Sequence, residues 1–257
     1  MNAPLLVARD LAVAIGGRTV VHGLDMQIAA GERLAILGRN GAGKTTLLHT
    51  LAGLREAAGG SVELCGEALA RLGHRRMAQL RGVLLQQQVD AFPASVLQTA
   101  LIGRHPWLER WAWESTTDAR IARDALTAVG LGDFAERDVQ TLSGGERQRL
   151  AIATLLTQQP RLALLDEPLS HLDLNHQIAA LELLSRHVRE TGMALVMVMH
   201  DPGLAARYCE RVLLLHGDGR VEAGDVADML TAERLSALYQ HPLRMFEVDG
   251  QRCFLPL

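Results

Sequence analysis

Lysine is almost absent from this sequence of 257 residues, because 25 of its 26 basic residues are arginine and only Lys44 is lysine. An ammonium group is a compact point charge, whereas a guanidinium is a planar fork with fixed donor directions. Keeping a single lysine in such a chain indicates a specific need for an ammonium at position 44. Chance in an arginine-rich chain is the alternative, and the residues around Lys44 decide between the two.

The sequence also has few cysteines and no long apolar run. Its 3 cysteines lie far apart without a Cys-x-x-Cys pair, which favours reduced thiols in a reducing compartment. The apolar run at residues 193–199 has the length of a buried strand and is far shorter than the roughly 18 residues of a membrane span. The first residues lack the features of a signal peptide. We therefore expect a cytoplasmic chain that can still dock on a membrane protein.

Charge and composition exclude two further classes. Hydrophobic residues make up 48% and charged residues 21%, so the chain can bury a core and is not intrinsically disordered. Acidic residues number 29 against 26 basic ones, and the net charge of −3 argues against a general nucleic-acid binder. The length suits one large domain, or one domain with an inserted subdomain.

Strands are predicted to alternate with helices along the chain. A helix is expected over residues 44–52, and residues 88–158 are expected to be mostly helical. Between residues 174 and 188, leucine, isoleucine and valine recur at helical spacing. The predicted strands are residues 5–8, 11–15, 19–22, 24–28, 34–37, 61–64, 162–165 and 194–199. This alternation predicts an α/β core with the helical block as an insertion.

A phosphate-binding loop follows the apolar stretch at residues 34–37. Residues 38–46 read GRNGAGKTT, which matches the Walker A pattern GxxxxGK[ST] between a predicted strand and a predicted helix. The glycines allow backbone N–H groups to point inward, where they and the positive helix end attract phosphate oxygens. Lys44 would bridge the β- and γ-phosphates, and the Thr45 hydroxyl would bind Mg²⁺. This context explains the single lysine.

Two carboxylates end a second apolar stretch. Residues 161–165 are followed by Asp166 and Glu167, as in a Walker B strand. Asp166 would hold Mg²⁺ through water, and Glu167 would act on the attacking water as general base or orienting group. An acidic turn after a buried strand is the alternative, and the Walker A loop in the same chain disfavours it.

A third motif, LSGGERQR at residues 142–149, begins a predicted helix. Ser143 and Glu146 form a capping-box pattern, and two glycines follow the serine directly. A helix start with uncovered N–H groups is an anion site. A plain capped helix is the alternative for an isolated Ser-x-x-Glu, but the complete motif is far more specific.

With these motifs in this order, the sequence resembles the ATP-binding cassette (ABC) ATPases over nearly its whole length. The resemblance implies an α/β fold with a P-loop NTPase core of the RecA type, an N-terminal antiparallel β subdomain and an inserted helical subdomain. The core with its β subdomain would span residues 1–87 and 159–257, and the helical subdomain with the signature motif would span residues 88–158. ATP and Mg²⁺ are the implied cofactors.

In that family, the signature helix of one subunit caps the nucleotide bound by the P-loop of another. A chain with one Walker A loop and one signature must then pair head to tail with a second copy, or with an equivalent ATPase. The signature residues expected at the partner's ATP are Leu142, Ser143, Gly144, Gly145 and Glu146. Ser170 and Asp173 resemble the D-loop, with Asp173 reaching across the dimer.

The resemblance also assigns catalytic and cofactor-binding residues. Gln86, Glu167 and His200 would be catalytic, although Gln87 and Gln88 leave the register of the glutamine open by a residue. The Mg²⁺ ligands would be Thr45, Gln86 and Asp166. The nucleotide would contact Ile15, Gly38, Arg39, Asn40, Gly41, Ala42, Gly43, Lys44, Thr45 and Thr46.

Ile15 departs from the family pattern, which usually places an aromatic residue here to stack on adenine. An isoleucine side chain leaves only apolar contact with the base. We therefore expect weaker discrimination between bases than in relatives with a tyrosine.

The family resemblance favours the energising subunit of an importer. Residues 91–106, with Gly103, Arg104 and Pro106, resemble the subclass that imports cobalamin, haem and ferric siderophores, and residues 230–239 fit less specifically. The implied partners are two transmembrane permease subunits and, indirectly, a periplasmic or surface substrate-binding protein, with no nucleic acid. The expected location is peripheral, on the cytoplasmic side of the inner or plasma membrane. The alternative is a soluble, non-transport ABC ATPase acting in nucleic-acid maintenance or translation.

All 3 tryptophans fall within seven residues, at Trp107, Trp111 and Trp113. Trp107 and Trp111 would share a face if this stretch were helical. Two interpretations remain open: the cluster is a small core of the helical insertion, or part of it borders the docking groove for the permease.

Overall fold

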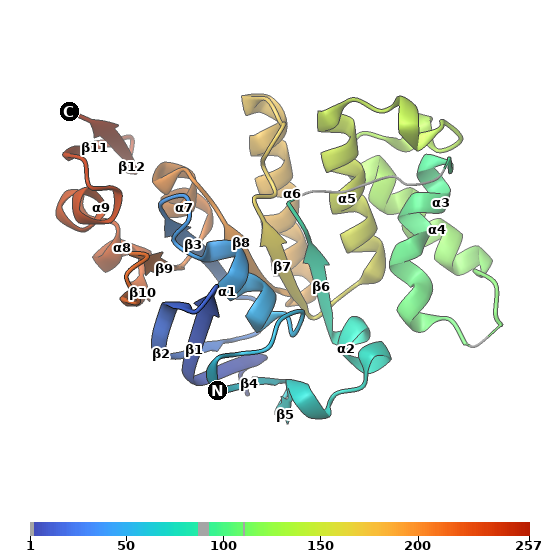
Figure 1. Cartoon of the computed structure of the whole chain (residues 1–257). Helices are drawn as coiled ribbons and strands as arrows, with labels where there is room; N and C mark the ends of the chain where they lie inside the picture. The colour runs from blue at the N-terminus through green and yellow to red at the C-terminus, as the bar shows by residue number, and fades with distance from the viewer. Residues whose placement is uncertain (1–2, 87–92, 110) are drawn as a thin grey trace. The chain divides into compact units, whose positions relative to one another are not determined.

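The computed structural model describes residues 3–86, 93–109 and 111–257. The chain forms two compact units, one made of Met1–Leu72 and Ala194–Leu257 and the other of Gly73–Met193 (Figure 1). The predicted helical insertion falls inside the second unit, which also contains two strands and a long helix. The subdomain boundaries expected from the sequence remain a prediction.

The first unit contains an antiparallel sheet near the N-terminus. Its strand order is β2-β1-β4-β5, with β1 Leu6–Ile15, β2 Arg18–Ile28, β4 Gly59–Leu64 and β5 Glu67–Ala68. The short stretches predicted at 5–8 and 11–15 join into the single strand β1. Asp10 lies between them with a left-handed φ of 45°, and the pairing register shifts there. Such an irregularity interrupts the apolar pattern without ending the strand.

The strand β3 (Arg33–Gly38) organises the rest of this unit. It pairs in parallel with β8 (Ala194–Val198) and with β9 (Arg211–Leu215), and β10 (Val221–Asp225) pairs antiparallel with β9. Residues of β3 and β8 are almost all buried, as their continuous apolar runs predict. Parallel strands place their carboxyl ends at one edge, where ligands bind in such sheets.

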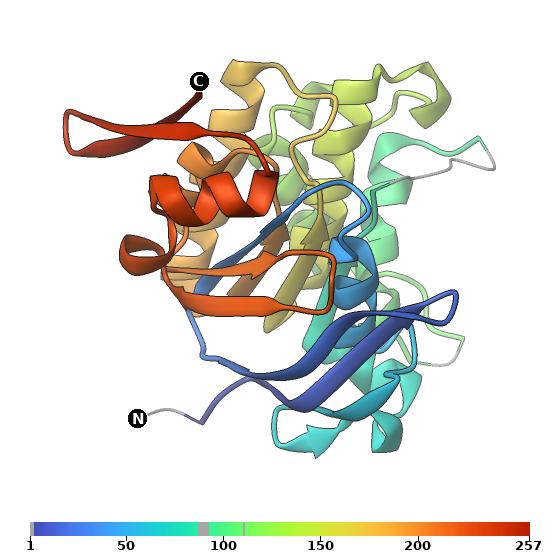
Figure 2. The ribbon, with the colours of Figure 1, turned by 60° about the vertical axis from the view of Figure 1, so that its left-hand side comes forward.

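Helices and a hairpin complete the first unit. α1 (Lys44–Leu51) follows β3, and η1 (Leu69–Arg71) follows β5. The C-terminal part contains α7 (Pro202–Tyr208), α8 (Val226–Met229), α9 (Ala232–Tyr239) and the hairpin of β11 (Leu243–Val248) and β12 (Gln251–Pro256). The red hairpin lies beside α9 in Figure 2.

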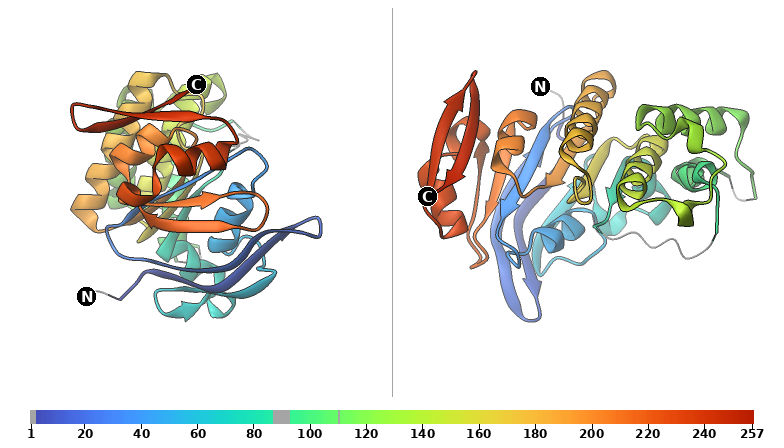
Figure 3. Two further views of the ribbon diagram at one scale, coloured as in Figure 1. Left: turned by 90° about the vertical axis from the view of Figure 1, so that its left-hand side faces the viewer. Right: turned by 90° about the horizontal axis from the view of Figure 1, so that it is seen from above.

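The second unit is mostly helical. Its two strands, β6 (Arg81–Leu84) and β7 (Leu162–Asp166), pair in parallel. Its short helices are α2 (His74–Leu80), α3 (Val96–Leu101), η2 (Ile102–Trp107), η3 (Gly132–Phe134) and η4 (Val139–Thr141). Its longer helices are α4 (Thr116–Ala128), α5 (Gly144–Gln158) and α6 (Leu174–Thr191). α3, α4 and α5 pack against one another, as the right-hand view of Figure 3 shows.

Within the described residues, no helix is both long and apolar enough to cross a lipid bilayer.

Candidate nucleotide site

The Walker A loop connects the buried end of β3 to the start of α1. Gly41 and Gly43 have φ angles of 79° and 97°, which side chains strongly disfavour. A Cβ atom at Gly43 would lie only 2.7 Å from Val20 Cγ2. Both the backbone angle and the close contact therefore require glycine at position 43.

The start of α1 is open to a ligand. Gly43 occupies the N-cap position, makes no side-chain cap hydrogen bond, and no acidic residue lies in the first turn. The first N–H groups of a helix have no acceptors inside the helix, and they carry partial positive charge. This helix start can therefore bind an anion such as phosphate.

Lys44 is positioned over the loop by backbone carbonyls. Its Nζ donates to Gly38 O at 2.9 Å and to Arg39 O at 3.1 Å, and the residue is only 6% exposed. The compact ammonium is thus held against the same loop whose N–H groups face the anion site. Thr45 and Thr46, the next two residues of α1, are half-buried.

His200 lies at the same edge of the sheet as the Walker A loop. Ile36 of β3 pairs with Val198 of β8, and Met199 N donates to Ile36 O at 3.1 Å. Gly38 and His200 each come two residues after this pair, so both follow the carboxyl ends of neighbouring parallel strands. His200 is exposed.

The C-terminal helix α9 contacts both of these loops, which the sequence reasoning missed. The Gln240 side chain accepts a hydrogen bond from Arg39 of the Walker A loop, and Tyr239 Oη donates to His200 O at 3.5 Å. Burial raises the pKa of Tyr239 to about 12, so this hydroxyl keeps its proton. No local motif in residues 230–239 predicts these contacts.

Ile15 ends β1 at the turn formed by Gly16 and Gly17 and is 40% exposed. It pairs with Arg18 across this turn. Its side chain therefore offers an exposed apolar surface within the unit that carries the Walker A loop. The expectation of weaker base discrimination remains a prediction.

In the second unit, the parallel pairing of β6 and β7 brings Gln86 and Glu167 together. Leu84 pairs with Leu165, and Gln86 Nε2 donates to Glu167 Oε2 at 3.0 Å. Gln87 and Gln88 lie outside the described residues, so the choice of Gln86 as the family glutamine remains a prediction. Asp166, which ends β7, is fully buried.

The oxygen donors expected for Mg²⁺ suit that ion. A threonine hydroxyl, a glutamine amide oxygen and a carboxylate are the hard ligands that Mg²⁺ prefers. Gln86 uses its amide nitrogen toward Glu167, which leaves its amide oxygen available to a metal.

The signature motif begins α5 with the capping box that the sequence predicts. Ser143 Oγ accepts from Glu146 N at 3.3 Å, and Ser143 N donates to Glu146 Oε2 at 2.7 Å. These bonds to Ser143 and the nearby Arg137 lower the pKa of Glu146, so its carboxylate stays ionised. Leu142 is buried just before this start, whereas Ser143 and Gly144 are exposed.

α5 is also joined to the segments that follow Walker B. The buried Gln148 donates from Nε2 to Pro168 O at 2.8 Å. A Cβ atom at Gly145 would lie 3.2 Å from His171 O, so the helix start packs closely on the D-loop segment. The role of Gln148 was not predicted, although it stands inside the LSGGERQR motif.

The D-loop residues make local hydrogen bonds. Ser170 donates to Glu167 O from both its N–H and its hydroxyl, at 3.1 and 2.9 Å. Asp173 caps α6 by accepting from His176 N at 2.9 Å, and this contact and the His176 ring lower its pKa. Its expected reach across a dimer remains a prediction.

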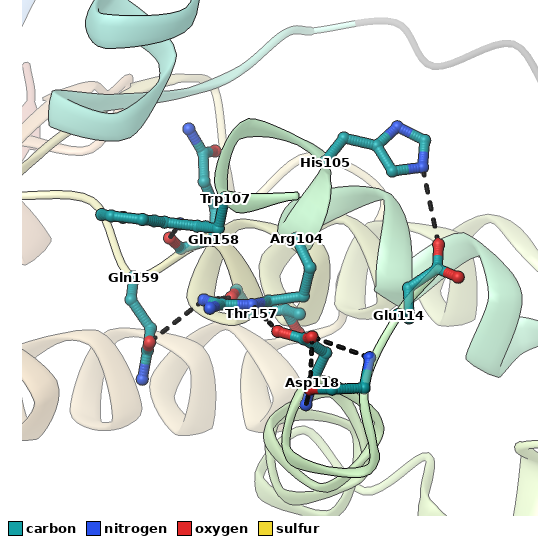
Figure 4. A network of polar contacts seen from close by, with 9 residues as sticks. Arg104, His105, Trp107, Glu114, Asp118, Thr157, Gln158 and Gln159 are labelled. Atoms are coloured by element: carbon teal, nitrogen blue, oxygen red, sulfur yellow. Dashed lines mark hydrogen bonds and ion pairs between the residues drawn. The ribbon is translucent and has the colours of Figure 1, made fainter. Parts of the chain in front are cut away.

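A buried ionic network holds the helical part of the second unit (Figure 4). Arg104, 9% exposed, donates from Nε to Asp118 Oδ1 at 2.7 Å and from Nη1 to Thr157 O at 3.2 Å. Hydrogen bonds from Ser115, followed by those from Arg104, lower the pKa of Asp118 to about 2. A Cβ atom at Gly103 would lie 2.3 Å from Thr154 O. The close packing at Gly103 and the buried hydrogen bonds of Arg104 thus give a structural reason for these two residues in the sequence.

The tryptophans do not form the small core considered from the sequence. The helical stretch η2 ends at Trp107, so the condition under which Trp107 and Trp111 would share a helix face is not met. Trp107 donates from Nε1 to Gln158 O at 2.8 Å, but Trp111 and Trp113 are both 89% exposed.

Comparison with known proteins decides the family. The model of the ABC transporter family matches residues 21–170, more than half of the chain. This chain belongs to the ABC transporter family. It is therefore an ABC-type ATPase, and the predicted fold class is confirmed.

Similarity to curated relatives extends over nearly the whole of this ABC ATPase. It is 40% identical over 258 residues to the hemin import ATP-binding protein HmuV of Rhodococcus jostii, covering 99% of this chain and 87% of that protein. It is 42% identical over 258 residues to the protein of the same name from Deinococcus radiodurans, covering 98% and 96%.

Two solved structures are similar to this ABC ATPase. A metal-chelate type ABC transporter in an inward-facing conformation matches with a TM-score of 0.86 and 30% identity, covering 99% of this chain and 98% of that one. The dimer of an ATP-binding cassette with ADP and phosphate in a post-hydrolysis state matches with a TM-score of 0.74 and 25% identity, covering 86% and 98%. ABC ATPases of this kind bind ATP, form dimers and work with permeases.

Proposed function

We propose that this ABC ATPase energises the import of a metal chelate, with haem as the first cargo to test. The observation that carries the proposal is the 40% identity over 99% of the chain to a hemin import ATP-binding protein. The similarity to a metal-chelate type transporter supports the same substrate class. The reported relatives give no support to a role in nucleic-acid maintenance or translation.

In the proposed cycle, two copies bind two ATP molecules and close head to tail. The open start of α1 and Lys44 hold the β- and γ-phosphates, and Ser143 and Gly145 of the other copy approach the same γ-phosphate. The resulting positive and dipolar groups stabilise the charge that develops on the transferred phosphoryl group.

Hydrolysis needs a positioned water. Glu167, held by Gln86 at 3.0 Å, orients or deprotonates the attacking water, and His200 contacts the γ-phosphate. Mg²⁺, held by Thr45, Gln86 and Asp166, would neutralise phosphate charge when bound. No covalent intermediate on the protein is required.

Coupling to transport would use the helical part of the second unit. Closing and opening of the dimer would move these helices against two transmembrane permease subunits, and a periplasmic or surface binding protein would deliver the cargo. The ATPase itself does not contact the cargo in this scheme, which is why its own side chains do not identify the chelate.

The test is capture of partners from solubilised membranes by the Glu167→Gln variant with ATP, followed by reconstitution of the co-purifying permease. We expect ATP-dependent uptake of haem in vesicles, and cobalamin and a ferric siderophore serve as cargo controls. The Lys44→Ala variant provides the matched loss-of-ATPase control. Recovery of ribosomal or DNA-associated proteins without a permease would contradict the transport function, and uptake of another chelate would correct the cargo.

A further inference from the structure

The two most exposed indole rings of the chain lie close together in one segment of the second unit. Trp111 and Trp113 are each 89% exposed, and only Ala112 separates them. Large aromatic side chains at this exposure are unusual on a soluble surface and mark interaction sites. We call Trp111 and Trp113 the tryptophan tip.

Residues 106–108, which precede the tryptophan tip in the chain, are held by hydrogen bonds. Arg75 donates from Nη2 to Leu108 O at 2.6 Å and from Nε to Pro106 O at 3.1 Å. Trp107 donates to Gln158 O at 2.8 Å, and its ring lies 5.5 Å from the buried Arg104 guanidinium (Figure 4). The described anchors of this segment therefore lie at Pro106, Trp107 and Leu108, shortly before the two exposed rings.

The size of the tip distinguishes between kinds of partner. A large aromatic side chain buries about 150–250 Å², so two indoles offer on the order of 400 Å². A stable protein interface takes about 800 Å² from each partner. The tip is therefore too small to be a protein interface by itself. Tryptophan is, in contrast, enriched where proteins meet the headgroup region of a bilayer, because its ring is apolar and its N–H is polar.

Exposed arginines of α2, the helix that contacts the segment before the tip, suit an anionic surface. Arg75, which contacts the leading segment, and Arg76 are both exposed at the start of α2, and no acidic residue lies in the first turn of that helix. Glu109 is the exposed acidic residue of the segment, while Glu114 lies 3.8 Å from His105. Arginines next to interfacial aromatic residues strengthen binding to anionic lipid headgroups.

We propose that Trp111 and Trp113 insert into the headgroup region of an anionic lipid bilayer and that Arg75 and Arg76 face its phosphates. Trp107 is bonded to the last residue of α5, whereas the signature motif is at the first turn of this helix. A helix of 15 residues is about 22 Å long. Lipid contact at the tip would therefore leave the signature motif accessible to a nucleotide.

The three tryptophans make the proposal directly measurable, because Trp107, Trp111 and Trp113 are the only tryptophans of the chain. The purified full-length protein is mixed with protein-free vesicles of phosphatidylcholine alone or with about one third phosphatidylglycerol. We expect a blue shift of tryptophan emission and co-sedimentation with the anionic vesicles, weakened by high salt.

Two variants test the assignment. The double variant Trp111→Ser/Trp113→Ser is expected to bind anionic vesicles at least tenfold more weakly while its ATPase rate stays unchanged, and Arg76→Gln is expected to weaken binding about threefold. The matched control is Met245→Ser/Phe246→Ser, which removes apolar side chains of 41% and 43% exposure from β11 and should bind like the wild type.

Other outcomes would overturn the proposal. Equal vesicle binding by the Trp111→Ser/Trp113→Ser variant and the wild type would show that the tip is not the lipid contact. A blue shift that occurs only with vesicles containing the permease would assign the tip to a protein partner. Neither outcome would affect the proposed import function, which the capture experiment tests separately.

Discussion

The starts of α1 and α5 differ in how they treat the first N–H groups of a helix, which have no acceptors inside the helix. Both helices begin with glycine-rich sequence and expose N–H groups at the first turn. At α1, Gly43 provides no cap and no acidic residue follows. At α5, the side chains of Ser143 and Glu146 each accept from the other residue's N–H, as in the capping boxes of Ser95 at α3 and Ser115 at α4.

This difference indicates different tasks for the two helix starts. The start of α1 keeps its positive potential for a ligand and adds Lys44, so it can bind phosphate without help. The start of α5 carries an ionised Glu146, and its capping box pairs the N–H groups of Ser143 and Glu146 within the chain. Ser143 Oγ accepts there from Glu146 N, and the Ser143 side chain also helps to lower the pKa of Glu146. We infer that α5 contributes only when a second copy presents a nucleotide to it.

The largest effect is expected from Lys44→Arg, which keeps the charge of the α1 site and changes its shape. A planar guanidinium cannot follow the ammonium path over Gly38 O and Arg39 O, so ATPase activity should fall about a thousandfold. Steady-state phosphate release measures it. The conservative exchange Arg189→Lys on α6 is the control, and ATPase near the wild-type rate in Lys44→Arg would remove the special role of lysine.

The next largest effect is expected from Ser143→Asp, which tests whether the start of α5 contacts a nucleotide. Ser143→Asp keeps a good N-cap but places a carboxylate where the partner's γ-phosphate is expected, so ATPase should fall about a hundredfold while thermal stability changes little. Ser95→Asp makes the same exchange in the capping box of α3 and should leave ATPase unchanged. Equal ATPase rates in the two variants would show that Ser143 serves only as a cap.

A substitution at a third helix start, that of α4, should lower the stability of the fold without changing ATP hydrolysis. Asp118→Asn leaves the buried Arg104 without its counter-charge, and we expect a loss of about 2 kcal/mol in the free energy of unfolding at pH 7. ATPase per folded molecule should remain normal. Chemical denaturation measures the stability loss.

The stability difference between the wild type and Asp118→Asn should depend on pH with a definite sign. The folded Asp118 has a pKa of about 2, below the value of about 3.9 for an unperturbed aspartate. Its stabilisation is therefore complete above pH 4 and is lost as the pH falls from about 4 through 2. The stability difference between the wild type and Asp118→Asn should shrink over this range. A constant difference would contradict the assignment of the low pKa to Asp118.

The smallest effect concerns the base rather than the phosphates. Ile15→Tyr adds a ring able to stack on adenine, so ATP affinity and the preference for ATP over GTP should rise about threefold. Titration calorimetry with both nucleotides measures it. Unchanged affinity and preference would show that the side chain at position 15 does not contact the base.

Sequence patterns predicted the residues of the site better than the long-range contacts that hold these residues in place. The Walker A loop, the Walker B strand and the capping box at Ser143 are local in sequence, and each element is found where its pattern places it. Periodicity likewise identified the long helix α6, which runs over Leu174–Thr191.

The contacts that join distant segments could not be read in this way. The bond between Arg39 and Gln240 connects residues 201 positions apart, and the one between Gln86 and Glu167 connects residues 81 positions apart. Such pairs depend on strand pairing and helix packing, which no local pattern specifies. The sequence left open whether the tryptophan cluster forms a core or part of a surface, and the structure shows that Trp111 and Trp113 are exposed.

The sharing of one nucleotide between two copies is tested most directly by mixing two inactive variants. If α1 of one copy and α5 of another share each nucleotide, a heterodimer of Lys44→Ala and Ser143→Asp chains contains one intact site, formed by the wild-type parts of both chains. An equimolar mixture should therefore recover about a quarter of wild-type ATPase by random pairing, whereas each variant alone stays inactive. No recovery in a mixture that is shown to form heterodimers would mean that the two helix starts do not act on one nucleotide from different copies.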